Sequence, residues 1–167
     1  MKTTSGLLLA LLILISAGIA APLRAETVSF PKDKPALTVE VPAGWKADWI
    51  EAGVIPGGAR LQFQTEGGAA DLAIKTLPDG AGIIDDASAK ANFSKVALQD
   101  MKEMEASKCD DPEETTVAGH KAYKGKVMTG LGPMEYTIFT PDGKTYFSMF
   151  SMNGGAAPII AALKAAG

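Results

Sequence analysis

The sequence has 167 residues, of which 21% are charged and 47% hydrophobic, and its formal net charge is −3 at pH 7. Nucleic acid and anionic lipid are poor matches for an acidic chain, because binding to phosphate relies on clustered lysine and arginine. Cys109 is the only cysteine and His120 the only histidine, which excludes an intramolecular disulfide and any site built from several such ligands.

The N-terminus has the order of features typical of a secretory signal peptide. Lys2 supplies a positive charge, Leu7–Ile15 is an unbroken apolar run of nine residues, and small residues follow before Pro22. A charged start, an apolar core and a small-residue exit are what the export machinery recognises. The sequence therefore predicts an exported protein, periplasmic or secreted.

The leader is too short for an uncleaved membrane anchor, which is the alternative interpretation. Counted to Ala21, the apolar stretch has fifteen residues, against the roughly 20 needed to span a bilayer. Signal peptides are cleaved after a small residue, which permits a cut after Ala20 or after Ala25, and we favour Ala25. The mature chain, residues 26–167, is then expected to be a single domain with no stable membrane insertion. The cut removes two of the 16 basic side chains and no acidic one, leaving 14 basic, 19 acidic and a net charge of −5.

The first half of this domain alternates hydrophobic and polar residues over strand lengths, with turn residues between the segments. The predicted strands are Thr27–Phe30, Leu37–Val41, a strand around Leu61 and Phe63, and a strand around Leu72 and Ile74. The spacing between hydrophobic residues then changes to three or four positions, which is the spacing of one helix face. This predicts an amphipathic helix that is capped by Asp85 or Asp86 and ends near Ser107. Its buried stripe is Ala89, Phe93, Val96, Ala97, Met101 and Met104.

The second half returns to strands. We expect strands over His120–Met128, Met134–Ile138 and Thr145–Met152, and Thr145–Met152 is apolar on both faces, which predicts a central strand. Pro158 suits the first turn of a final helix. The predicted fold is α+β, an antiparallel sheet of about six or seven strands with a long central helix and a C-terminal helix.

Two stretches resemble a known family. One is Leu37–Val41 followed by Pro42-Ala43-Gly44-Trp45; the other is Val117–Tyr123, then Tyr136–Phe139, then Gly143–Phe147, closing on the Pro158 helix. This order is similar to the PsbP-like superfold, shared by the PsbP subunit of photosystem II, the nuclear transport factor Mog and many small exported bacterial proteins. The resemblance implies an αβα sandwich around an antiparallel sheet. It also implies a largely non-enzymatic role in binding a protein partner or supporting an assembly.

Two surface features are candidates for contact with a partner. Trp49 beside Val54 and Ile55 would form an apolar binding edge if exposed. Lys124 and Lys126 share one strand face and could dock an acidic partner, but we favour the simpler interpretation of a solvated strand face. The four acids in the segment from Asp110 to Glu114 lack the ligand spacing and glycine of a calcium loop and read as a solvated loop.

The remaining candidates concern ligands and catalysis. Phe93, Met101, Tyr136 and Phe150 could line an apolar ligand pocket between the sheet and the long helix. A hydrolase using Asp71 or Glu135 ranks last, because no partner group for either acid is evident. Asp110 and Asp111 are expected to raise the Cys109 thiol pKa, which disfavours a reactive thiolate. His120 reads as a partly exposed strand residue. We predict a non-catalytic exported binding or accessory domain with an envelope protein partner and no cofactor or metal; the alternative is a carrier of a small apolar ligand.

Overall fold

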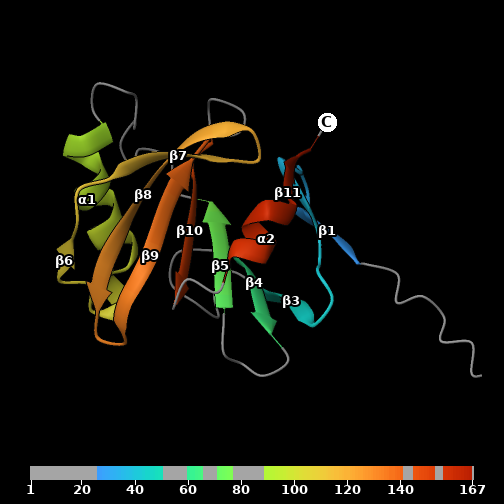
Figure 1. Ribbon diagram of the computed structural model, residues 1–167, viewed down its shortest axis with the longest axis horizontal. Coiled ribbons are helices and arrows are strands. Elements are labelled where there is room, and N and C mark those ends of the chain that lie inside the picture. The colour runs from blue at the N-terminus through green and yellow to red at the C-terminus, as the bar shows by residue number, and fades with distance from the viewer. Residues whose placement is uncertain are drawn as a thin grey trace, which may run out of the picture.

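The computed structural model describes residues 26–50, 60–65, 71–76, 89–140, 145–152 and 156–166. These residues form two antiparallel sheets and two α-helices, together with one short 3-10 helix (Figure 1). The protein is therefore α+β, as predicted. The predicted helix caps Asp85 and Asp86 lie outside the described residues.

The larger sheet has eight strands. Its order is β3-β4-β5-β10-β9-β8, and β6 and β7 both pair with the outer edge of β8. The strands are β3 (Trp45–Ile50), β4 (Arg60–Thr65), β5 (Asp71–Thr76), β6 (Lys108–Cys109), β7 (Glu113–Val117), β8 (His120–Thr129), β9 (Gly132–Phe139) and β10 (Phe147–Met152). Strand β10 pairs with both β5 and β9, and all its residues except Met152 are buried. The prediction of a central strand covered on both faces is confirmed.

A smaller sheet joins the two ends of the domain. Strands β1 (Thr27–Phe30) and β2 (Leu37–Glu40) pair with each other, and β11 (Leu163–Ala165) adds to the other edge of β2. Helix α2 (Ala157–Ala162) leads directly into β11. Figure 1 shows α2 and this sheet at one end of the molecule and α1 at the other.

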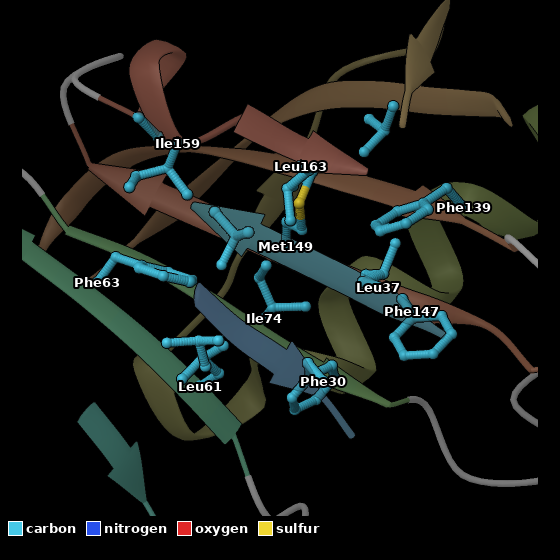
Figure 2. Close-up of a cluster of buried hydrophobic side chains, with 14 of the residues drawn as sticks. Phe30, Leu37, Leu61, Phe63, Ile74, Phe139, Phe147, Met149, Ile159 and Leu163 are labelled. Carbon is cyan, nitrogen blue, oxygen red and sulfur yellow. The ribbon is translucent and has the colours of Figure 1, made fainter. Parts of the chain in front are cut away.

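The first hydrophobic core lies between the small sheet and one face of the larger sheet. Strands β1 and β2 contribute residues such as Phe30 and Leu37, the larger sheet contributes residues such as Phe63 and Met149, and α2 contributes Ile159. Figure 2 shows these side chains converging from both sheets and from α2. Alternation along each strand explains why one face supplies them.

The second core lies on the opposite face of the larger sheet, under α1 (Ala89–Asp100). In β9, Tyr136 and Ile138 belong to this core, whereas the next residue, Phe139, belongs to the first core. Since neighbouring strand residues point to opposite faces, β9 and β10 are shared by both cores. Burial of apolar area on each face is the main force that holds the layers together.

Three details differ from the predicted elements. Helix α1 ends at Asp100 and a 3-10 helix, η1 (Lys102–Met104), follows it, so the long helix is shorter than predicted. The C-terminal helix stops at Ala162, and Leu163 begins a strand instead of continuing the helical stripe. Eleven strands rather than six or seven occur among the described residues, because β3, β6, β7 and β11 were not predicted as strands. Within the described ranges, no helix combines the length and apolar character needed to cross a membrane.

Candidate functional site

A bulge in the outer edge of β8 places three consecutive residues beside the sheet. Cys109 of β6 pairs with Val127 and Glu113 of β7 pairs with Lys124, so residues 110–112 oppose only residues 125 and 126. An extra residue of this kind interrupts the ladder and re-aims side chains. The Asp110 amide still donates to the Lys126 carbonyl oxygen at 2.9 Å, which ties the bulge to β8.

A cleft of about 330 Å³ opens at this bulge. Its lining residues are Asp110, Asp111, Glu113, Lys124, Gly125, Lys126 and Glu135. Strand pairing sets their arrangement, because Glu113 lies opposite Lys124 and Lys126 lies opposite Glu135. We refer to this feature as the charged cleft.

The charged cleft lies on the same sheet face as the first core. Lys124 and Lys126 alternate in phase with Ala122 of that core, and Glu135 alternates in phase with Phe139. The small sheet covers the apolar part of this face, whereas the charged cleft occupies a polar part further along β8 and β9. Strands β7, β8 and β9 can be followed to this region in Figure 1.

The six charged side chains of the cleft do not satisfy one another. Among the described residues, no hydrogen bond or ion pair is formed by the side chains of these four acids and two lysines. Elsewhere on the surface, Lys121 pairs with Glu114 at 2.9 Å and Lys164 with Glu40 at 3.1 Å. Of the six cleft side chains, Asp110, Asp111, Glu113 and Lys126 are exposed to solvent.

Gly125 gives the cleft a fixed inner wall. A Cβ atom at this position would lie 2.8 Å from Phe93 Cε1 and 3.3 Å from the Asp110 carbonyl oxygen. Only a residue without a side chain allows α1, β8 and the bulge to approach so closely. Because Phe93 is fully buried, the position of the bulge depends on the packing of α1.

The four predicted pocket residues are brought together, but in the second core. Phe93, Met101 and Tyr136 are at most 1% exposed and Phe150 is 7% exposed. The rings of Phe93 and Tyr136 meet edge to face, with centroids 5.9 Å apart. Side chains therefore fill the space between α1 and the sheet at this point, and the role of these residues in ligand binding stays a prediction.

Tyr136 also carries a buried polar contact. Its hydroxyl donates to Asp100 Oδ2 at 2.7 Å. Burial raises the pKa of Tyr136 well above its usual value, and the nearby Asp100 carboxylate raises this pKa further. The hydrogen bond links the last residue of α1 to β9.

Trp49 lies far from Lys124 and Lys126, the other residues predicted as candidates for contact with a partner. It belongs to β3, at the opposite end of the larger sheet from β6. Its ring is half-buried and stacks on Phe30 at 5.5 Å, with Lys32 Nζ 4.9 Å from the ring centroid. Val54 and Ile55 lie outside the described residues, so the predicted apolar edge is represented by Trp49 alone.

The remaining residues considered for catalysis or metal binding are Glu135, Asp71, Cys109 and His120. Glu135 lines the charged cleft, and Asp71 lies in β5, where its side chain is outside the description. Burial raises the pKa of Cys109, with smaller contributions from Asp110 and Asp111 that follow the predicted direction, while Ser94 lowers it. His120 begins β8 and is half-exposed, as expected. Within the described ranges, no three acids, histidines or cysteines are grouped to hold a metal ion.

The sequence singled out Lys124, Lys126 and, as a catalytic candidate, Glu135, but not the acids of the bulge. Asp110, Asp111 and Glu113 were read as a solvated loop, because nothing local in that segment indicates the edge of a strand. A signal was present in the alternation of Lys124 and Lys126, which requires a polar environment along one face of β8. The identity of the opposing residues depends on strand register, which the sequence does not state directly.

The comparisons with known proteins bear on the fold. No protein-family model and no curated protein matches the chain. Among solved structures, the chain is similar to the solution structure of cyanobacterial PsbP (CyanoP) from Synechocystis sp. PCC 6803. The two are 16% identical, with a TM-score of 0.52 over 92% of this chain and 99% of that one.

Two weaker likenesses were found. LpqN of Mycobacterium tuberculosis, described as involved in cell envelope biogenesis, is 13% identical with a TM-score of 0.39, covering 85% of this chain and 91% of that one. PA94 of Pseudomonas aeruginosa, a protein of unknown function and putative regulator by its description, is 12% identical with a TM-score of 0.35, covering 72% and 80%. Scores this low do not indicate a shared fold. From the likeness to CyanoP, which spans nearly the whole of both chains, this protein has a PsbP-like fold.

Proposed function

We propose that this protein is an exported, non-catalytic binding protein that holds a segment of an envelope protein in its charged cleft. The observation that carries the proposal is the set of six charged side chains that line one open cleft without pairing among the described residues. Asp110, Asp111, Glu113 and Lys126 are exposed, and Lys124 and Glu135 are half-buried. A partner can therefore contact these charges directly, and complementary charge on the partner favours its binding over that of other proteins.

The sequence supports the location. The leader at residues 1–25 has the pattern of a cleaved secretory signal, and the mature chain is acidic. The αβα sandwich implied by the family resemblance belongs to the same proposal, with α1 as one outer layer and α2 with the small sheet as the other. In such an arrangement, the exposed polar stretch of the central sheet is the natural contact surface.

The absence of catalysis is also part of the proposal. The lining of the cleft around Glu135 consists of carboxylates, lysines and one glycine, and includes no histidine, serine or cysteine. Nucleophilic catalysis of the serine–histidine or cysteine–histidine type requires a nucleophile that is hydrogen-bonded to a base. Among the described residues, the side chains that line the cleft form no such pair.

Site-specific photo-crosslinking in the native host tests this function. A photoreactive amino acid replaces Lys126 in the cleft and, as a matched control, Lys46, which is an exposed lysine of β3 in the same sheet. We expect one defined protein crosslink from position 126 and none of the same mass from position 46. Identical crosslinking patterns at both positions, or no protein crosslink at position 126, would refute the proposal.

The location is tested separately by the mass of the protein recovered from the envelope fraction. We expect the intact mass of a chain that begins at Glu26. A chain recovered from the cytoplasm with residues 1–25 attached would contradict export without bearing on the charged cleft.

A further inference from the structure

We infer that the partner segment bound in the charged cleft is cationic and presents lysine or arginine side chains to the bulge; this inference rests on the proposed function. The cleft holds four carboxylates and two ammonium groups, so its formal charge is negative even when both lysines are counted. Charge complementarity at a contact selects the partner and suppresses binding of the wrong sign. The partner therefore needs a net positive charge at this point.

The positions of the charges strengthen the inference. Asp110, Asp111 and Glu113 are exposed and lie together on the bulge and the start of β7, at the outer side of the cleft. On β8, Lys124 is half-buried and Lys126 is exposed. The exposed charges of the cleft are thus three carboxylates and one ammonium group. The field of a cleft in which one sign predominates increases the local concentration of ions of the opposite sign, here cations.

Lys124 and Lys126 have a different role in this arrangement. Each lysine is paired with one acid on a neighbouring strand. Lys124 lies opposite Glu113 of β7, and Lys126 lies opposite Glu135 of β9. They separate the carboxylates of the bulge from Glu135 and reduce the repulsion among the acids. An anionic partner attracted to the two lysines would have to lie beside all four carboxylates, which disfavours the acidic partner that the lysines suggest when considered alone.

Labelled peptides of fixed length test the sign of the partner. The probes are three fluorescein-labelled serine-spaced peptides that carry three arginines, three glutamates or no charged side chain. Binding to the purified full chain is followed by fluorescence anisotropy at an ionic strength of about 0.01 M and again at about 0.15 M, where the screening length falls from about 30 Å to about 8 Å. We expect the arginine peptide to bind most tightly and to weaken as salt is added.

Two variants of equal charge separate the cleft from general attraction to an acidic protein. The cleft variant combines Asp110→Asn, Asp111→Asn and Glu113→Gln. The control variant combines Asp33→Asn, Asp48→Asn and Glu103→Gln, which are exposed acids away from the cleft. We expect the cleft variant to bind the arginine peptide about tenfold more weakly than the control variant does, a loss of about three exposed charge pairs.

Tighter binding of the glutamate peptide, or equal affinities for the two variants, would overturn the inference. Either result can occur while position 126 still crosslinks to a partner, in which case the proposed function stands and only the charge of the partner was inferred wrongly. If position 126 gives no crosslink but the arginine peptide distinguishes the two variants, the proposed function fails while the cation preference of the cleft is retained. Circular dichroism of both variants confirms that each is folded before its affinity is compared.

Discussion

The substitution Gly125→Ala examines how tightly α1 is held against β8. A methyl group at this position would lie 2.8 Å from Phe93 Cε1 and 3.3 Å from Phe93 Cζ, in contact with a fully buried ring. The ring cannot swing into solvent, because it also packs edge to face on Tyr136. The added atom must therefore be accommodated by displacing α1 or the bulge.

The expected cost follows from two opposing effects. Overpacking a well-filled core typically costs about 1–3 kcal/mol. Replacing glycine by alanine within a strand returns about 0.5–1 kcal/mol, because the unfolded chain loses conformational freedom. We expect the free energy of unfolding to fall by about 1–2 kcal/mol, equivalent to a drop in Tm of about 2–8 °C for a domain of this size.

Urea denaturation followed by circular dichroism measures this change. The midpoint should fall while the slope stays the same, since the surface exposed on unfolding is unchanged. The matched control is Gly130→Ala, whose Cβ would lie 2.5 Å from Glu105 Oε2. That atom ends a flexible, exposed side chain and can rotate away, so this control should change stability by less than about 0.5 kcal/mol.

A second substitution identifies the clashing group. Phe93→Leu shortens the buried side chain, and the double variant Gly125→Ala/Phe93→Leu should lose less stability than the sum of the two single variants. Coupling of about 0.5–3 kcal/mol is typical for residues in direct contact. If Gly125→Ala is at least as stable as the natural protein, or if the two changes are additive, the close packing of Phe93 on β8 is refuted.

Three further predictions concern the side chains of Tyr136 and Cys109. Tyr136→Phe should lower the free energy of unfolding by about 1 kcal/mol in urea, because the 2.7 Å hydrogen bond to Asp100 is lost; an unchanged midpoint would contradict this. The raised pKa of Tyr136 contributes stability that is fully present below its unfolded value of about 10 and is lost as the pH rises above it. Absorbance titration should therefore show one tyrosine ionising only as the protein unfolds, and three normal tyrosine titrations in the folded protein would exclude this. Because the pKa of Cys109 is raised, iodoacetamide should modify the folded protein more slowly near neutral pH than the urea-unfolded chain, and equal rates would count against it.

The regular strands were predictable because their side chains alternate. Leu37–Val41 and Met134–Ile138 each place their hydrophobic residues on one face, and the structure buries those faces. The stripe of α1 was also informative, since Met101 remains buried even though the α-helix has ended at Asp100. Periodicity predicted which residues are buried better than where the helix stops.

The unpredicted strands are those that depend on a partner for their conformation. Glu113–Val117 is polar over most of its length and becomes β7 because it pairs with β8. Leu163–Ala165 follows an alanine-rich helix, and pairing with β2 overrides its helical preference. The charged cleft could not be predicted for the same reason. The pairings of Glu113 with Lys124 and of Lys126 with Glu135 depend on the register of β7 and β9 against β8.

The order of strands in the small sheet has a consequence for the timing of folding. Strand β2 precedes every strand of the larger sheet in the chain, whereas β11, which completes its far edge, follows all of them. Until β11 pairs with β2, Leu37 and Val39 have no cover from Leu163, and closing so large a loop is slow. The small sheet therefore closes over the first core only after the strands of the larger sheet have been released.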